Sequence, residues 1–439
     1  MKKIVFLLAV LLTFCFAQSH LNAPGIAYLF SNSAVVEGWE TIGTNPANLG
    51  FYFDDSLTVS SLNIGFLPMV SVPAVNFGNN AFSYSLLMKD FFHGGKLSVK
   101  NKNNLLDAVS SNGVNGHFQM TQNILKYSRN NIAFGLSLES LGETQLPKSF
   151  INFGLNGNQF DQLIHIDDLD GEALLYSNFN FYLGHRFKKD FYKKYFKELY
   201  WGIGVDLILG GIYQDIEKMD GYITSRTDAL EISGKARSRV GTGGLGFALD
   251  LGLTGKIDDN FYTSITLQNP ISLIRWGVFD MIKIDGKNTQ VYEYDYYLEL
   301  ESEEFFSDAI DSLLDAAVQT DSSYTGKKFN SHLPASYNLS ASYQFSEKFK
   351  INAAVYGYFS NKFGLDFVPK ISTVVTYNPN QAWPLILGLG TGKFNQFTWS
   401  LGTGIHKGRY HLDLGFSQYG GLFNYSRGFY FALDQSFYF

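Results

Sequence analysis

Alternating apolar and polar positions dominate the second half of the chain. In the stretch SYNLSASYQF (336–345), Tyr337, Leu339, Ala341, Tyr343 and Phe345 alternate with small polar residues. The same alternation recurs later in FTWSLGTGI (397–405) and HLDLGFS (411–417), and earlier over 132–139, 199–210 and 245–254. A period of two with one apolar side predicts extended strands that separate two environments.

A transmembrane barrel explains this series better than a soluble β-sandwich does. The strands run for about 10 residues or more, which is the length needed to cross hydrocarbon at a tilt. Their non-apolar side is small and polar, as a wet lumen requires, and lacks the Lys and Glu of a solvent-facing surface. We therefore predict an all-β fold: a transmembrane antiparallel β-barrel.

Loop lengths support the same fold. Tight turns lie at 128–131, 256–260, 346–349, 378–381 and 406–409, and long excursions lie at 89–113, 142–170, 214–242 and 276–332. Counting back from a periplasmic C-terminus gives about 14 strands (range about 12 to 16), with the tight turns periplasmic and the excursions outside. The predicted strands lie near 80–89, 114–127, 131–141, 171–187, 199–213, 243–256, 261–275, 333–345, 349–360, 367–378, 384–392, 397–406, 409–417 and 427–438.

Four segments depart from this scheme. The turn at 188–198 is long for the periplasmic side. Residues 57–66 look like a strand, but a fifteenth wall strand would break the even number of a closed bacterial barrel, so they belong either to the plug or to a pair with 67–79. Residues 103–109 and 303–318 have helical spacing and are predicted to be short helices in outer loops, where they cover the rim.

The last strand, SRGFYFALDQSFYF (426–439), places its aromatic residues mainly on one face. Lipid would satisfy that face, and Phe439 would close the sheet beside the first wall strand, because an open edge in hydrocarbon leaves unpaired backbone groups. A terminal aromatic residue on an alternating strand also resembles the signal that the barrel assembly machinery reads. We expect that machinery and outer-membrane lipid to be partners of the chain.

The N-terminus has the pattern of a secretory signal. Lys2 and Lys3 precede an apolar stretch over 4–12 that is too short to span a bilayer, and Cys15-Phe16-Ala17 fits a cleavage site. We predict a signal peptide at 1–17, a plug or hatch segment at 18–56 and a barrel at 57–439, in the Gram-negative outer membrane. The alternative is a lipoprotein signal with Cys15 lipidated, against which the bulky Phe14 argues.

Composition excludes several functions. Cys15 is the only cysteine, so cleavage would leave a mature chain without disulfides, thiolate metal sites or thiol catalysis. Loss of Lys2 and Lys3 leaves 32 basic against 40 acidic residues, a charge of −8, which does not favour nucleic-acid binding.

Motifs for enzyme chemistry are weak. GLGTGK (388–393) lacks the first glycine of a phosphate loop, and GTGGLG (241–246) opens a strand instead of a helix. The eight histidines are scattered, with no pair at metal-ligand spacing on one element. We therefore expect no enzyme activity, no cofactor and no metal.

Charged residues on the polar side of the strands are the candidate lumen positions. They are Glu139, Arg186, Asp206, Asp250, Lys350 and Asp413. One interpretation is a hydrated lumen whose salt bridges hold the plug, and the other is a pathway that selects a solute.

Several segments carry a family resemblance. GTGGLGFALDLGLTGKIDDNFYTSITLQNPISLIRWG (241–277), 94–113 and 130–158 resemble an uncharacterised family of outer-membrane barrels, a domain of unknown function. That family is loosely similar to long-chain fatty-acid transporter barrels. TNPANLG (44–50) resembles the Asn-Pro-Ala element with which those relatives begin their barrel, and this adds Asn45 and Pro46 to the candidate plug residues. The resemblance implies a barrel with residues 18–50 folded inside.

Two functions follow as hypotheses. The first is passive transport of a small hydrophobic solute, through plug rearrangement or a lateral gap in the wall. The alternative is a non-transporting surface or secretion-accessory barrel that acts through its outer loops. A continuous apolar track inside the barrel would favour transport, whereas a filled lumen would favour the second role.

Overall fold

The computed structural model describes most of the chain. The described residues are 21–52, 59–65, 72–91, 97–157, 163–165, 169–188, 190–226, 229–280, 288–301, 328–360, 362–363, 367–380, 382–391 and 396–439. The predicted signal peptide and the predicted helix at 303–318 lie outside these ranges.

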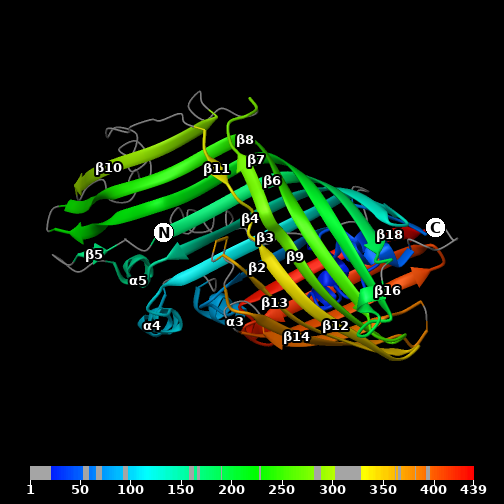
Figure 1. The fold of residues 1–439 in the computed structure, drawn as a ribbon. Coiled ribbons are helices and arrows are strands. Elements are labelled where there is room, and N and C mark those ends of the chain that lie inside the picture. The colour runs from blue at the N-terminus through cyan, green and yellow to red at the C-terminus, as the bar shows by residue number, and fades with distance from the viewer. Residues whose placement is uncertain are drawn as a thin grey trace.

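The described strands form one closed antiparallel β-barrel with 14 wall positions (Figure 1). The wall strands are β1 Ser60–Ile64, β2 Val72–Asn79, β3 Val114–Arg129, β4 Ile132–Leu146, β6 Asp170–Arg186, β7 Glu198–Ser225, β8 Ala229–Lys256, β9 Phe261–Arg275, β12 Ser336–Ser346, β13 Phe349–Tyr358, β14 Lys370–Tyr377, β15 Leu385–Thr391, β16 Phe397–Lys407, β17 Tyr410–Tyr419 and β18 Gly428–Tyr438. The predicted fold class is confirmed. We call the end with the tight turns the turn end and the opposite end the loop end.

The first wall position is shared by β1 and β2. Both pair with β18 on one side and with β3 on the other, β1 at the turn end and β2 at the loop end. Of the predicted segment 57–66, strand β1 therefore belongs to the wall without adding a fifteenth position, and it lies neither in the plug nor in a pair with 67–79. Ser60 and Phe439 exchange backbone hydrogen bonds of 2.8 and 3.2 Å, which closes the sheet at the turn end and satisfies these backbone groups within the wall. Recognition of Phe439 by the assembly machinery stays a prediction.

The strand predicted at 80–89 is wrong. This segment forms helix α3 (Tyr84–Leu86) and the π-helical turn η3 (Leu87–Phe91). The Asn79 side chain accepts from the backbone N–H groups of Ala81 and Phe82 and so ends β2 in a turn, and the Ser83 hydroxyl accepts from Leu86 N–H and caps the helix. These local hydrogen bonds outweigh the apparent alternation of the sequence.

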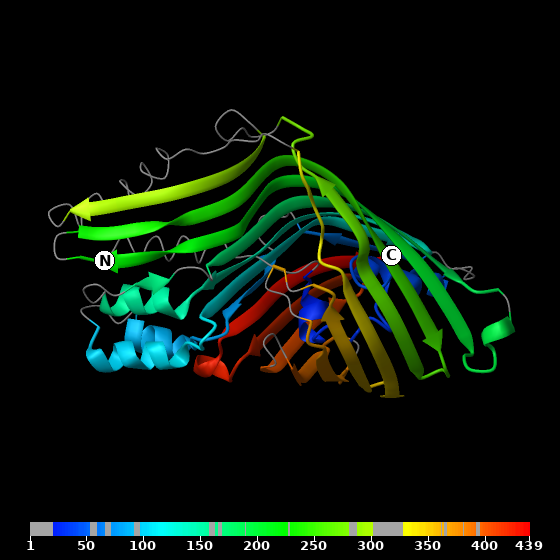
Figure 2. The same ribbon diagram turned by 60° about the vertical axis from the view of Figure 1, so that its left-hand side comes forward.

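The excursion predicted at 214–242 does lie beyond the barrel wall, but β7 and β8 continue into it as strands past their predicted ends at 213 and 243. Strands β7 and β8 stay paired to the end, from Glu198 opposite Lys256 to Ser225 opposite Leu230. The loop-end part of β7 and β8 lacks a clear apolar side because it lies beyond the barrel wall, where neither face of the strands needs to contact lipid. Strands β5 (Ile164–His165) and β10 (Thr289–Glu301) pair with β7 and β8 and extend this loop-end sheet (Figure 2). The short strand β11 (Asn330–Ser331) pairs with β9.

Helices gather at the loop end. Helix α4 (Val99–Ala108) covers residues 103–108 of the predicted helix at 103–109. Helix α5 (Lys148–Asn156), which the alternation did not indicate, packs against α4 (Figure 2). Short 3-10 turns are η4 (Asp190–Tyr192), within the predicted long turn, and η6 (Phe423–Tyr425). Within the described residues, no helix has the length and hydrophobicity to cross a membrane.

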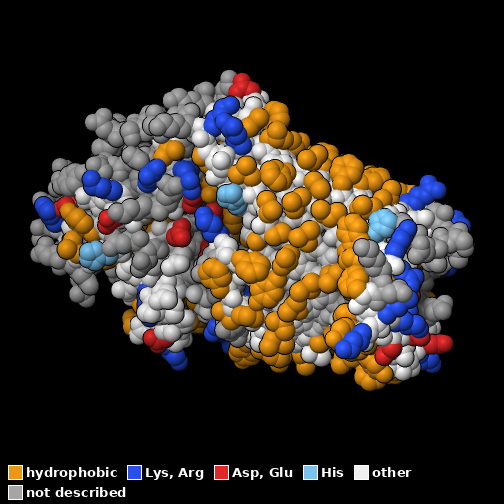
Figure 3. Space-filling view, viewed as in Figure 1, with side chains coloured by type: hydrophobic (Ala, Val, Ile, Leu, Met, Phe, Trp, Pro, Cys, Tyr) orange, Lys and Arg blue, Asp and Glu red, His pale blue; other side chains and the backbone are white. Residues whose placement is uncertain are grey.

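The outer face of the wall is apolar and the inner face is small and polar. Phe181, Leu207 and Leu387 are 60%, 49% and 62% exposed, whereas Asp206, next to Leu207 in the strand, is 0% exposed. Apolar side chains cover the barrel surface in Figure 3, and charged ones gather toward its two ends. This arrangement is that of a wall with lipid outside.

The N-terminal segment lies inside the barrel. Residues 21–52, which we call the inner segment, contain α2 (Ala23–Ala27), η1 (Gly38–Thr41) and η2 (Pro46–Tyr52). Helix α2 contacts β15 to β18, η1 contacts β1, β3 and β4, and η2 contacts β6, β7 and β8 (Figure 1). Most of its residues are buried, so the inner segment fills the lumen toward the turn end.

Candidate functional site

Three glycines in neighbouring strands form the seat of the inner segment. Gly184 of β6 pairs with Gly202 of β7, which pairs with Gly252 of β8, so the three lie side by side. A Cβ atom on Gly202 would lie 2.2 Å from the Pro46 carbonyl carbon and 2.4 Å from the Ala47 nitrogen. Glycine at these positions is therefore what allows the backbone of η2 to approach the wall.

Asn45 holds this seat with its side chain. Its Nδ2 donates to the Ser33 carbonyl at 2.7 Å and to the Thr254 hydroxyl at 2.8 Å, and its Oδ1 accepts from Ala47 N–H at 3.1 Å. Asn48 donates to Ser33 and Val36 carbonyls and accepts from Thr254. Asn45 and Pro46 thus both lie where the inner segment meets β6 to β8.

Asp434 of β18 anchors the start of the inner segment. Its Oδ2 accepts from Ala23 N–H at 2.6 Å, and its Oδ1 accepts from Asn63 of β1 at 3.3 Å and Asn123 of β3 at 3.4 Å. One buried carboxylate therefore joins the inner segment to the three strands at the closure of the barrel. Sequence reasoning missed Asp434, although it stands on the polar side of the alternating last strand.

Further polar wall groups satisfy the backbone of the inner segment around the lumen. The backbone N–H groups of Leu21, Trp39 and Gly43 donate to the hydroxyl groups of Thr121, Ser61 and Tyr182 respectively. The backbone carbonyls of Ala27, Leu29, Phe30 and Ile42 accept from the side chains of Ser400, Ser372, Asn338 and Lys126 respectively. Buried backbone groups without partners are costly, so these side chains stabilise one position of the segment.

Three of the predicted lumen carboxylates lie on the inner face of the wall between β4 and β8. Glu139 of β4 accepts from Ser137 and Tyr176 at 2.8 and 2.7 Å, and Asp206 of β7 accepts from Asn180 at 2.6 Å. Asp250 of β8 accepts from Tyr182 and, at 2.9 Å, from Asn269 N–H, where it supports a bulge in β9. All three are buried, and they hold wall residues and the Tyr182 contact to the inner segment in place.

Arg186 and Lys350 lie apart from these carboxylates, at the turn end. The guanidinium of Arg186 lies 3.4 Å from Glu198, and Lys350 Nζ lies 5.4 Å from the centre of the Tyr28 ring. Both line a cavity of about 510 Å³ between the inner segment and the wall, together with Glu37, Tyr52 and Lys256. This cavity is charged and polar.

Glu40 of η1 has an unusual acid–base property. Burial inside the barrel raises the pKa of Glu40 from 4.5 to about 8, with smaller contributions from the charges of Asp413 and Glu37 in the same direction and an opposing one from Lys350. The neutral carboxyl is thus the form that the folded barrel favours near neutral pH.

We expect this group to make the stability of the barrel depend on pH. The contribution of Glu40 to the free energy of unfolding is full below pH 4.5. It falls by up to about 1.4 kcal/mol per pH unit as the pH rises from 4.5 toward 8, and it changes little above pH 8. Urea midpoints of the folded barrel between pH 4.5 and 9 measure this slope. Glu40→Gln should flatten it, and Glu347→Gln, at an exposed turn, should not. An equal slope in Glu40→Gln would contradict the assignment.

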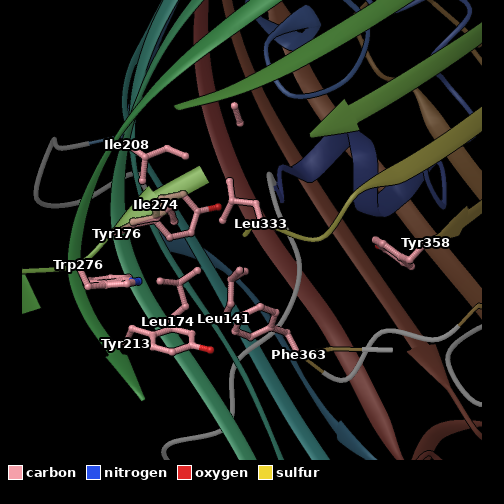
Figure 4. Close-up of a cluster of buried hydrophobic side chains, with 11 residues drawn as sticks. Leu141, Leu174, Tyr176, Ile208, Tyr213, Ile274, Trp276, Leu333, Tyr358 and Phe363 are labelled. Carbon is pink, nitrogen blue, oxygen red and sulfur yellow. The ribbon is translucent and has the colours of Figure 1, made fainter. Parts of the chain in front are cut away.

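Apolar side chains line the lumen toward the loop end (Figure 4). This loop-end cluster consists of Leu141, Leu174, Tyr176, Ile208, Tyr213, Ala248, Ile274, Trp276, Leu333, Tyr358 and Phe363. Trp276 stacks on Tyr213 with ring centres 5.6 Å apart and donates from its indole nitrogen to Ser331 at 2.8 Å. Members from β4, β6, β7, β8 and β9 therefore meet residues of the loops above β12 and β13.

The cluster reaches the inner segment through Tyr358. Tyr358 also lines a cavity of about 50 Å³ between β9, β12 and β13 and the inner segment. The lining of this cavity is mainly polar and includes Asn32, Thr44, Gln268 and Asn338 beside the aromatic rings of Phe30 and Tyr356. The route from the loop end therefore starts among the apolar side chains of the loop-end cluster and reaches the inner segment at a small polar cavity. Sequence alternation could not reveal this route, because its members stand on the inner side of distant strands.

Asp413 lies in a group that the sequence did not indicate. His406 of β16 and His411 of β17 face the lumen opposite each other, and His406 Nε2 lies 2.8 Å from Asp413 Oδ1. The sequence feature that could have indicated this group was the tight turn at 406–409, because a two-residue hairpin loop at 408–409 pairs position 406 with position 411.

The closed wall, its apolar exterior and its occupied lumen define the chain as a transmembrane β-barrel of the outer-membrane type. The chain belongs to the family of unknown function DUF5723, whose model matches residues 58–240 and 230–415. This confirms the resemblance to an uncharacterised barrel family. No relative was found among the curated proteins.

Solved structures share the fold. A Pseudomonas aeruginosa FadL homologue is 11% identical, with 96% of this chain and 99% of that chain covered and a TM-score of 0.51. The Ralstonia pickettii toluene transporter TbuX is 12% identical, with 95% and 98% covered and a TM-score of 0.47. The first of these likenesses supports a common barrel fold and nothing more about this chain.

Proposed function

We propose that this chain passes a small apolar solute across the Gram-negative outer membrane, through a barrel that the inner segment plugs. The observation that carries the proposal is the loop-end cluster, whose apolar and aromatic side chains line the lumen and extend to Tyr358, next to the inner segment. The predicted signal peptide at 1–17 would bring the chain to that membrane.

The loop-end cluster suits the binding of such a solute. Concave sites lined by apolar and aromatic side chains with few polar groups are typical of small-molecule sites. Here Trp276 and Tyr213 supply aromatic rings, and the Ser331 hydroxyl, which accepts a hydrogen bond from the Trp276 indole, supplies a polar group. A solute that separates these side chains would replace their mutual contacts with its own apolar surface.

The inner segment must then move for the solute to leave. It is hydrogen-bonded to wall strands around the lumen and seated on Gly184, Gly202 and Gly252, so it obstructs a straight path. The polar cavity of about 510 Å³ beyond it, at the turn end, would receive the solute. No energy source is needed if the solute moves down its gradient.

A charge placed in the loop-end cluster should stop transport. Phe363 is 1% exposed in the loop after β13, and Phe367, in the same loop, is 56% exposed. Because burying a charge costs several kcal/mol, Phe363→Asp should lower solute uptake by at least about tenfold, whereas Phe367→Asp should leave it nearly unchanged. The measurement is uptake of radiolabelled toluene by Gram-negative cells that express equal amounts of folded barrel.

The control is the same strain without the protein. Equal uptake with and without the barrel would remove the transport function, and equal uptake by Phe363→Asp and the unaltered chain would remove the proposed route.

The loop-end sheet favours the second candidate, an interaction role. Strands β10, β8, β7 and β5 stand beyond the barrel with α4 and α5 nearby, and this part carries ion pairs such as Arg239–Asp215 and Arg226–Glu231. Binding of a partner to the loop end, together with no solute uptake, would support that role.

A further inference from the structure

The hairpin of β16 and β17 brings two imidazoles and a carboxylate together at the turn end. Lys407 pairs with Tyr410 across a two-residue loop of Gly408 and Arg409, and Gly408 has φ +62°. A two-residue loop of this kind fixes the register. His406 therefore lies directly opposite His411, and Asp413, two residues on from His411, faces the same side.

The pairing type brings the side chains close. The backbone N–H of His406 donates to the Ala382 carbonyl at 2.8 Å, so it points away from β17, and His406 and His411 form a non-hydrogen-bonded pair. Such pairs have the shorter separation between strands. The two rings stack with centres 3.9 Å apart and planes 9° apart.

Gly404 makes room for the carboxylate. It pairs with Asp413, and a Cβ atom at this position would lie 2.4 Å from Asp413 Oδ1 and 3.0 Å from His406 Nε2. The absence of a side chain at 404 is thus what lets the imidazole and the carboxylate meet at 2.8 Å.

We propose that His406, His411 and Asp413 bind one divalent transition-metal ion of the zinc type. One ligand atom from each of the three residues lies within 4.8 Å of the others. Zinc bound at about 2.0–2.1 Å by nitrogen and oxygen places its ligands roughly 3.3 Å apart, so side-chain rotations that unstack the two imidazoles would complete the set. Two imidazoles and a carboxylate suit zinc or nickel better than calcium or magnesium, which prefer oxygen ligands alone.

The ion would be reached from the turn end and would lie beside the inner segment. The side chains of His406 and Asp413 are 24% and 19% exposed, so the group is neither sealed nor on the open surface. Glu40 of η1 lies close enough for the charge of Asp413 to act on its carboxyl group. Water would complete the coordination. This site is separate from the loop-end cluster and does not depend on the proposed transport.

The test is metal binding by the purified full-length barrel in detergent. Titration with Zn²⁺ by calorimetry should give one site, and Co²⁺ should give visible absorption bands of a low-coordinate site. His411→Asn should weaken Zn²⁺ binding by at least about 10- to 100-fold, since even loss of a ligand's supporting group costs that much. His185→Asn is the control, because His185 stacks on Trp201 elsewhere in the wall and should bind as the unaltered chain does.

A second variant keeps all three ligands. Gly404→Ala places a methyl group between Asp413 and His406 and should also weaken Zn²⁺ binding by at least about tenfold. Gel mobility with and without heating shows whether each variant is a folded barrel. No saturable Zn²⁺ binding by the unaltered chain, or binding that survives His406→Asn with His411→Asn, would overturn the proposal.

Discussion

Alanine at position 202 is expected to lift the inner segment off the wall. The added methyl group would meet the Pro46 and Ala47 backbone at 2.2 to 2.4 Å, and neither a main chain nor a barrel strand can move aside as a flexible side chain could. Overpacking of this kind costs about 1–3 kcal/mol, and contact with backbone on two atoms places Gly202→Ala near the upper value.

The measurement is protease cleavage within residues 21–52 in the otherwise folded barrel. A loss of about 3 kcal/mol raises the population of the open segment about 100-fold, and the cleavage rate follows when opening is fast. Gly154→Ala in α5 is the matched control, because nothing lies within 4 Å of the Cβ atom that it adds. Unchanged cleavage in Gly202→Ala would show that the seat does not hold the segment.

Loss of the Asp434 carboxylate should destabilise both the inner segment and the closure of the barrel. Asp434→Ala leaves Ala23 N–H and the amides of Asn63 and Asn123 without this acceptor. Buried donors that lose a partner cost about 1–3 kcal/mol each, and shared effects do not add fully, so we expect a loss of about 3 kcal/mol.

Urea midpoints in lipid vesicles measure this loss. Asp434→Asn keeps one acceptor oxygen and should lose less, and Asp107→Ala, at an exposed position of α4, should change the midpoint little. The seat variant and the anchor variant should differ from each other. Gly202→Ala should expose the inner segment with little effect on the wall, whereas Asp434→Ala should weaken both the inner segment and the wall. A midpoint unchanged in Asp434→Ala would contradict the anchoring role.

The wall strands could be predicted from local pattern. Leu207 and Asp206 show why: neighbouring residues in a strand face lipid and lumen, so a membrane imposes a strict alternation that a single sequence records. Turn lengths then ordered the strands, and the wall strands from β3 to β18 lie close to their predicted positions, whereas β5, β10 and β11 fall within predicted excursions. The pattern failed at 80–89, where Asn79 and Ser83 end the strand and start a helix, and at 214–242, where strands outside lipid need no apolar face.

The interior followed different rules. Six inward charges could be placed on the lumen side, but their alternation did not say which would meet. Glu139, Asp206 and Asp250 lie on the same side of the barrel, between β4 and β8, Arg186 and Lys350 line a separate cavity, and Asp413 joins two histidines. Asp434 had the same local signal and was not singled out, because its importance comes from Ala23, which lies 411 positions away in the chain.

Alternation, turn lengths and the N-terminal pattern were enough to predict a secreted membrane barrel, because each is a local response of the chain to lipid, water or a sharp reversal of direction. The seat of the inner segment, the loop-end cluster and the His406–His411–Asp413 group could be identified only from the folded barrel. Each arises where closure brings residues from distant strands into register, and packing distances between them leave no mark on the local sequence.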